Sequence, residues 1–180
     1  IPPAVECQTI ISSDDVQVTA SIPLSLTIGE RSFVVETVIP ADDAWRSPED
    51  DAQTAAWICG TIVNYVIELG DDPENGALLN GLRPGDEMRL LLSNGMTLIF
   101  QFTEQRQGVD LADASAFTQF DPRLTLLLQQ EDGTWQVVTA NFFAESGPAQ
   151  PDVGTPVQPG QLAQIGQAQV TVLKGHTQSG

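Results

Sequence analysis

The chain has 180 residues, of which 41% are hydrophobic, so it carries enough apolar material for one compact domain. Its charge is unbalanced: 24 Asp and Glu stand against 7 Lys and Arg, for a formal net charge of -17. Binding to nucleic acid or to an anionic membrane surface needs clustered cationic side chains, and Lys174 is the only lysine. Both partner classes are therefore excluded, and we interpret the acidity as a surface adapted to solubility or salt.

No run of about 18 or more apolar residues is present, so no membrane-spanning helix is expected in this sequence. The first residues also lack the basic and apolar regions of a signal peptide. A chain that starts at Ile1 rather than at a methionine is typical of a processed or trimmed form.

The N-terminal part predicts strands. Residues 4–11 are apolar enough for a strand, and residues 16–22 alternate apolar and polar side chains with a period of two. Residues 32–39 follow a turn at Gly29 and are rich in β-branched side chains. We assign residues 1–21 to an N-terminal arm or strand that precedes the main domain.

The middle of the chain is also dominated by strand patterns, with hairpin turns at Asn94-Gly95 and at Asp132-Gly133, where residues accept a positive φ at little cost. The predicted strands are residues 57–69, 87–93, 97–105, 124–129 and 135–143.

Helical signals are few. Residues 72–79 predict a short helix, with Asp72 as the N-cap and Pro73 at the first helical position. Residues 110–117 predict one or two further helical turns.

Beyond the predicted main domain, residues 22–145, the composition changes. Residues 146–160 hold four prolines and three glycines, which predicts an extended connection over the surface. Residues 168–173 return to a strand pattern within the last segment, residues 146–180. This strand must pair with an edge of the domain or with a neighbouring molecule, because an unpaired strand edge is prone to associate.

The two cysteines, Cys7 and Cys59, are in neither a CxxC motif nor a Cys-His cluster. A disulfide between them would fix the N-terminal arm to the main domain and would indicate a compartment outside the cytoplasm. Two buried free thiols remain the alternative.

The acidic run Glu68, Asp71, Asp72 and Glu74 offers oxygen ligands of the kind that calcium accepts. It lacks the ligand spacing and the glycine of an EF-hand loop, so a solvated loop with helix-capping roles is the preferred interpretation. We therefore expect no metal and no cofactor, and keep Asp71, Asp72 and Glu74 as weak calcium candidates.

Two stretches resemble the sortase family. The first comprises residues 57–65 and 75–90, and its turn Leu82-Arg83-Pro84-Gly85-Asp86 is similar to the "L-x-x-G-D" turn of sortases. The second comprises residues 122–129 and 134–140, and it is similar to the family's Leu-Thr-Leu-x-Thr-Cys and Arg-Leu-Val-Val segments.

The resemblance covers roughly residues 22–145. It implies a mostly β fold: a sortase-like closed β-barrel with one or two short helices and extended terminal arms.

The departures from the family concern the residues that carry its chemistry, a Cys nucleophile, a His and an Arg. The position that matches the Cys falls on Gln129, and the position that matches the Arg falls at about Trp135. The only histidine, His176, is the fifth residue from the C-terminal end, and the hydroxyls of Ser93 and Ser115 have no triad partner in the sequence. The resemblance therefore implies a catalytically degenerate sortase-like domain, and we expect no enzyme activity.

Two functions stay open. The first is a non-catalytic extracellular structural or protein-interaction domain, a subunit of a cell-surface filament, layer or larger complex, whose partner is another protein or a second copy. The second is a ligand- or glycan-binding module that uses the degenerate groove at Gln129 and Trp135. For a glycan, Trp45 and Trp57 are further stacking candidates.

Overall fold

The computed structural model describes residues 7, 9–12, 16–40, 52–111, 114–147, 162–165 and 168–172. Three sequence predictions lie outside these ranges: the role of Trp45, the placement of His176, and the Pro- and Gly-rich connection after its first two residues.

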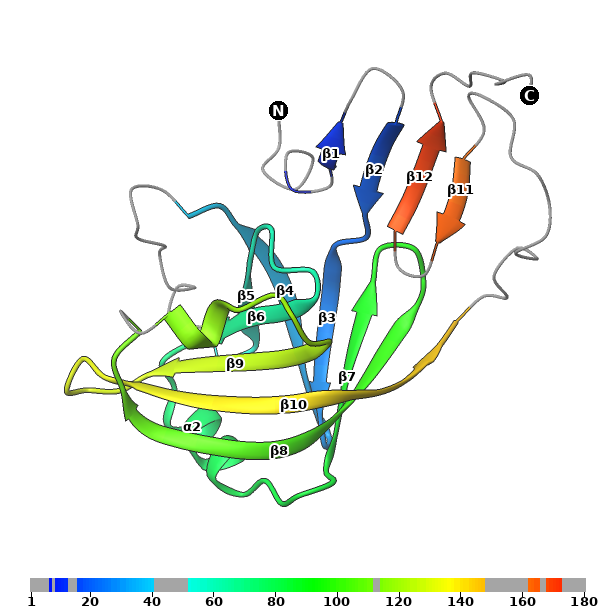
Figure 1. The fold of residues 1–180 in the computed structure, drawn as a ribbon. Coiled ribbons are helices and arrows are strands. Elements are labelled where there is room, and N and C mark those ends of the chain that lie inside the picture. Colours follow the sequence, from blue (N-terminus) through cyan, green and yellow to red (C-terminus); the bar gives the residue numbers. More distant parts are fainter. Residues whose placement is uncertain are drawn as a thin grey trace, which may run out of the picture.

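Eight strands close into a barrel (Figure 1). Around the barrel they follow the order β10-β8-β7-β3-β4-β5-β6-β9, so every strand has a hydrogen-bonded neighbour on each side. Closure removes the open edges of a flat sheet. The strands are β3 (Pro23–Ile28), β4 (Arg31–Val38), β5 (Thr54–Ile58), β6 (Asn64–Leu69), β7 (Glu87–Leu92), β8 (Thr97–Val109), β9 (Arg123–Gln129) and β10 (Trp135–Ser146). The predicted mostly β, closed-barrel fold is confirmed.

Two contacts in the barrel are parallel, β4 with β5 and β6 with β9, and the others are antiparallel. Parallel neighbours need a crossover connection. Between β6 and β9 this connection contains helix α2 (Pro73–Asn80), strands β7 and β8, and the 3-10 helix η1 (Ala114–Phe117). Because β6 and β9 run in the same direction, their C-terminal ends lie at the same end of the barrel.

The main core fills the barrel and follows the period of two that strands impose. In β7, Met88, Leu90 and Leu92 are fully buried while the residues between them are exposed. In β8, Leu98 and Phe100 continue the same layer, and Phe100 meets the ring of Tyr65 edge to face. This alternation places the intervening residues of both strands on the outer face of the barrel.

Helix α2 starts as predicted. The Asp72 side chain accepts a hydrogen bond from the backbone N–H of Glu74 at 2.7 Å, and Pro73 occupies the first helical turn. The side chains of Asn75 and Leu79 are buried toward the barrel. The helix is therefore anchored by one apolar and one polar side chain on the same face.

The predicted strand over residues 57–69 is wrong in one respect, because it is two strands separated by a turn. Gly60 has a φ of 88°, and the Thr61 hydroxyl donates to the carbonyl of Ile58 at 2.6 Å and accepts from the N–H of Val66 at 3.1 Å. The apolar and β-branched residues of this turn continue the strand-like composition, which hides the break in the sequence.

The terminal strands form a sheet of their own, with the order β1-β2-β12-β11. The strands are β1 (Thr9–Ser12), β2 (Val16–Ala20), β11 (Leu162–Ile165) and β12 (Ala168–Val172). The predicted C-terminal strand thus pairs within its own chain, antiparallel to β2, and not with an edge of the barrel. The barrel has no open edge to offer because it is closed, so the two ends of the chain pair with each other (Figure 1).

The predicted disulfide is confirmed. Cys7 and Cys59 are bonded, with their Cα atoms 5.5 Å apart, and Cys59 follows β5 directly. The bond joins the N-terminal arm to the barrel across 52 residues of sequence. Both cysteines of the chain are used in it, so neither offers a thiol.

Candidate functional site

The two groove residues predicted from the sequence lie side by side at one end of the barrel. Gln129 ends β9, Trp135 begins β10, and the two residues are opposite each other in the antiparallel register. Gln129 is exposed, whereas Trp135 is half-buried because it packs against a second hydrophobic cluster. The Trp135 side chain is therefore occupied by contacts within the chain, and only Gln129 of the two faces solvent.

This second cluster lies on the outer face of the barrel. Ile58, Val66, Leu127 and Val137 come from four neighbouring strands, and each is at most 3% exposed. Outward-facing apolar side chains are buried only where another element covers them. We call these four residues the outer floor.

The cover comes from the end of β8 and the connection to β9. Val109, Leu111 and Phe117 pack on the outer floor together with Trp135. We use the name cap for Val109, Leu111 and residues 114–119. Because the cap already occupies the outer floor, the surface beside Gln129 and Trp135 is filled by the chain itself.

Gln119 is the first of three side chains that fix the cap to the barrel. The Oε1 atom of Gln119 accepts hydrogen bonds from three consecutive backbone N–H groups, those of Ile62, Val63 and Asn64, at 3.1, 3.0 and 3.1 Å. Its Nε2 atom donates to the carbonyls of Asn64 and Phe117 at 2.9 and 3.2 Å. Gln119 thus uses both ends of its amide to join the β5–β6 turn, β6 and the cap.

Buried Asn64 forms the other half of this connection. Its Nδ2 atom donates to the carbonyls of Ala116 and Thr118 at 2.8 and 3.2 Å, and its Oδ1 atom accepts from the hydroxyl of Thr125 at 2.8 Å. Each hydrogen-bonding group of the Asn64 side chain therefore has a partner, as a fully buried amide requires. Neither Asn64 nor Gln119 was identified from the sequence, because all of their partners except Phe117 lie more than 50 residues away.

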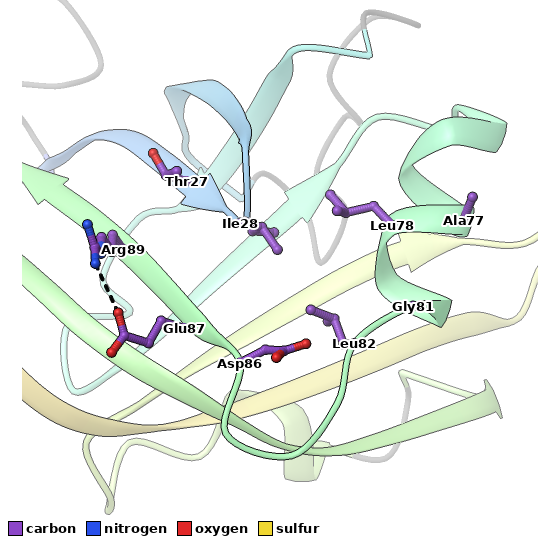
Figure 2. Close-up of a pocket in the computed structure, with 10 residues that line it drawn as sticks. Thr27, Ile28, Ala77, Leu78, Gly81, Leu82, Asp86, Glu87 and Arg89 are labelled. Atoms are coloured by element: carbon purple, nitrogen blue, oxygen red, sulfur yellow. Dashed lines mark hydrogen bonds and ion pairs between the residues drawn. The ribbon is translucent and has the colours of Figure 1, made fainter.

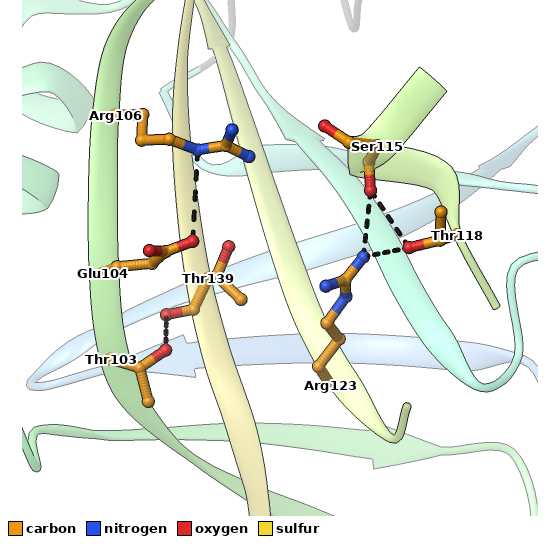
Figure 3. A network of polar contacts seen from close by, with 7 residues as sticks. All are labelled: Thr103, Glu104, Arg106, Ser115, Thr118, Arg123 and Thr139. Carbon is orange, nitrogen blue, oxygen red and sulfur yellow. Dashed lines mark hydrogen bonds and ion pairs between the residues drawn. The ribbon is translucent and has the colours of Figure 1, made fainter. Parts of the chain in front are cut away.

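Arg123 completes the attachment from β9. Figure 3 shows its guanidinium directed at the η1 segment, where it donates to the carbonyl of Ser115 at 3.0 Å and to the hydroxyl of Thr118. On the neighbouring strands, the Thr103 hydroxyl donates to the carbonyl of Thr139 at 2.9 Å and joins β8 to β10 (Figure 3). The cap is therefore held by side chains from β6, β9 and the cap itself.

Two of the three calcium candidates are used in other contacts. Asp72 caps helix α2, and Glu74 pairs with Arg31 at 3.2 Å. Glu68, from the same acidic run, is only 1% exposed on β6, whereas Asp71 is exposed at the end of that strand. Within the described ranges, no three acidic, His or Cys side chains lie close enough together to hold a metal ion.

Two ionisable groups are perturbed. Burial raises the pKa of the Tyr65 phenol well above its ordinary value, because the charged phenolate would lie in the barrel core. Hydrogen bonds from the Thr134 hydroxyl and backbone N–H lower the pKa of Asp132 in the β9–β10 turn.

The other chemical candidates from the sequence are in structural positions. Trp57 is 0% exposed and donates its indole N–H to the carbonyl of Thr61 at 2.9 Å, so it cannot stack on a sugar. The Ser93 hydroxyl accepts a hydrogen bond from the N–H of Ile22 at 3.1 Å. The glycan-binding alternative therefore loses Trp57, and Trp135 is packed against the outer floor.

On a different part of the barrel surface, no described helix or strand covers the outward-facing side chains. One row of side chains crosses five strands through direct register partners: Val34, Ser25, Leu91, Thr97 and Ser146. A second row runs beside it: Ser32, Thr27, Arg89, Ile99 and Ala144. We call these ten residues the open face.

The open face contains no acidic residue of its own, although Glu36 and Glu87 lie at its borders. It contains a single charged residue, Arg89, in a chain with a net charge of -17. Val34 is 63% exposed and Leu91 is 36% exposed, and both lie next to Ser25. Seven residues of the open face line a hollow of about 460 Å³.

Comparison with known proteins identifies the fold. No protein-family model matches the chain, and neither does any curated protein. Solved structures do match. Sortase A of Listeria monocytogenes superposes with a TM-score of 0.56 at 12% identity, over 72% of this chain and 92% of that one. Sortase E1 of Streptomyces coelicolor, solved with a tripeptide in its active site, gives 0.54 at 11% identity, over 71% and 91% of the two chains.

The barrel has the sortase fold. Sortase C of Streptococcus pneumoniae agrees, with a TM-score of 0.54 and 14% identity over 72% of each chain. At these identities the similarity establishes the fold alone. No helix in the described ranges is long and apolar enough to cross a membrane.

The sequence-based expectation that the chain is not an enzyme is contradicted by these comparisons. The matching structures reported above are sortases, and a further match from Clostridium perfringens is described as a sortase D5 transpeptidase. The expectation was drawn from the residues at positions 129 and 135 and from the position of the only histidine, His176. Absence of a cysteine at one strand end excludes a thiolate there, but it does not exclude catalysis by a barrel that belongs to an enzyme fold.

Proposed function

We propose that the chain is an extracellular structural and protein-interaction domain that assembles with further copies of itself through the open face, within a cell-surface filament, layer or larger complex. The observation that carries this proposal is the contrast in charge between the open face and the remaining surface. A chain with a net charge of -17 repels its own copies over most of its surface. Contact between copies is least opposed where acidic side chains are missing, and interface cores are depleted of charge.

The exposed apolar side chains support the same surface. Val34 and Leu91 are large, exposed and adjacent to Ser25, on strands whose other faces form the barrel core. Together with Ile99 they supply the apolar contact that an interface between copies needs.

The extracellular location is supported by the disulfide, since such bonds persist in oxidising compartments. It is also supported by the fold, because a sortase C from Clostridium perfringens has been solved in an intermolecular complex with the C-terminal cell wall sorting signal motif. The terminal sheet supports a second contact between copies. In the described residues β1 and β11 are its edge strands, and the unpaired backbone groups of an edge strand can pair with a strand of another molecule.

Sedimentation velocity at low and high salt tests the proposal. Electrostatic repulsion is screened over about 10 Å at 0.1 M salt and about 3 Å at 1 M, so the sedimentation coefficient of the native protein should rise with salt. The variant Val34→Glu with Leu91→Glu should stay monomeric. The control Phe120→Glu replaces an apolar residue that is 87% exposed away from the open face, and it should assemble like the native protein.

A native protein that stays monomeric at every salt concentration would overturn the proposal. Equal loss of assembly in the open-face variant and in the Phe120→Glu control would assign assembly to general charge and not to the open face.

A further inference from the structure

A groove lies between helix α2 and the β3–β4 turn at one end of the barrel. It consists of two neighbouring hollows, of about 620 Å³ and 520 Å³, that share the side chain of Leu78. Gly29 lines the larger hollow and Glu30 the smaller one, so the β3–β4 turn contributes to both. We call the two hollows together the α2 groove.

The larger hollow has an apolar floor. Figure 2 shows the side chains of Leu78 and Leu82 directed toward Ile28, with Asp86 below them. Ile28 is fully buried, and the two leucines are half-buried. An aliphatic chain laid across this floor would remove the exposed parts of both leucines from water.

The rim of the larger hollow carries excess negative charge. Glu87 and Arg89 form an ion pair at 3.0 Å, which Figure 2 shows at the edge of the hollow. Asp86 is exposed and accepts a hydrogen bond from the backbone N–H of Arg83 at 2.8 Å. No cationic side chain of the described residues pairs with Asp86, so its charge faces the hollow uncompensated.

The smaller hollow likewise has one Arg–Glu ion pair and one further carboxylate at its rim. Arg31 pairs with Glu74 at 3.2 Å and also donates to the carbonyl of Ala52 at 2.9 Å. Its guanidinium lies 5.5 Å from the ring centroid of Phe33, so Arg31 is held in place by three contacts. Glu30 lines the same hollow and is exposed, and no cation of the described residues pairs with it.

We propose that the α2 groove binds an extended polypeptide segment that carries two basic residues separated by one residue. In an extended chain, residues i and i+2 point to the same side, about 7 Å apart. Each of the two adjacent hollows has one exposed carboxylate that no cation of the described residues pairs with, and each can take one such side chain. One basic head group pairs with Asp86 and the other with Glu30, while their aliphatic stems lie on the leucines of the floor.

Charge and shape together select this occupant. Each hollow needs one positive charge at its rim and an aliphatic stem above Leu78, and lysine and arginine supply both in one side chain. An acidic or purely apolar segment would leave the two carboxylates uncompensated.

Isothermal titration calorimetry at low salt tests the proposal with the capped peptide Gly-Ser-Arg-Thr-Arg-Ser-Gly and with the same peptide carrying glutamine for both arginines. The arginine peptide should bind, and the glutamine peptide should not. Because an exposed ion pair contributes up to about 1 kcal/mol, Glu30→Gln and Asp86→Asn should each weaken binding about fivefold, and the double variant about 25-fold. Leu78→Ser should also weaken it, by at least about threefold.

The matched control is Glu131→Gln with Glu145→Gln, which removes two exposed carboxylates outside the groove. It should change the affinity by less than about twofold. Equal weakening by the control pair and the groove pair would show attraction to the acidic surface in general and would overturn the proposal. Absence of binding to a correctly folded native protein would overturn it as well. The assembly test replaces Val34 and Leu91, neither of which lines the α2 groove, so failure of one proposal does not decide the other.

Discussion

Removal of the Gln119 side chain should loosen the cap and lower the stability of the whole barrel. In Gln119→Ala, the N–H groups of Ile62, Val63 and Asn64 lose their common acceptor. A buried donor without a partner costs about 1–3 kcal/mol. Asn64 is fully buried, whereas Ile62 and Val63 are half-buried and regain part of the loss from water.

We therefore expect the free energy of unfolding to fall by about 2–4 kcal/mol. For a domain of this size, such a loss lowers Tm by roughly 5–15 °C. Thermal unfolding followed by circular dichroism measures it, and hydrogen exchange should show faster exchange at the amides of Ile62, Val63 and Asn64.

The matched control is Gln107→Ala. Gln107 is exposed and makes a single hydrogen bond, to the Oδ1 atom of Asn80 at 3.0 Å. That oxygen keeps Gln105 and Gln136 as donors, so the free energy of unfolding should change by less than about 0.5 kcal/mol. Equal melting temperatures for the Gln119 and Gln107 variants would refute the role assigned to Gln119.

Three further predictions concern single groups. Alkylation without reductant should label neither Cys7 nor Cys59, and reduction should lower the stability by about 4 kcal/mol in the chain-entropy model, measured by denaturant unfolding; alkylation of the native protein would contradict this. Tyr65 has a raised pKa when folded, so its stabilising effect is present below the unfolded pKa and is lost at alkaline pH; the phenolate absorbance of this sole tyrosine should appear only with alkaline unfolding. Asp132 has a lowered pKa, and Thr134→Val should raise it in an NMR titration; an unchanged pKa would exclude the hydroxyl as its cause.

The sequence predicted the barrel well where one side chain in two is buried. β7 alternates strictly between buried and exposed residues, and the turn before β8 has a glycine with a φ of 82° at position 95. Asp72 and Pro73 correctly predicted the start of α2, because the hydrogen bonds that cap a helix N-terminus involve only neighbouring residues. Local signals of this kind need no knowledge of distant residues.

Strand β3 was not predicted, although it is central to the barrel. Pro23 at its start and a register shift between Pro23 and Ser25 interrupt the pattern of a regular strand. The strand is formed because β4 and β7 pair with it on both sides. The pairing with β4 and β7 therefore makes this segment a strand, although its own residues do not indicate one.

The candidate site depended even more on contacts between distant residues. Gln129 and Trp135 could be placed together because only a short turn separates their strands. The cap that covers their surroundings depends on Gln119 and Asn64, whose partners are far along the chain, and no local motif marks either residue. The open face likewise needed the order of five strands, because its charge is visible only when their outward residues are placed side by side.

Cryo-electron microscopy of the protein assembled at high salt is the most direct test of the proposed function. We expect Val34 and Leu91 to be buried between copies, with β12 paired to β2 of the same molecule. An assembly in which Val34 and Leu91 face solvent, or in which β12 pairs with β2 of another molecule, would contradict the account.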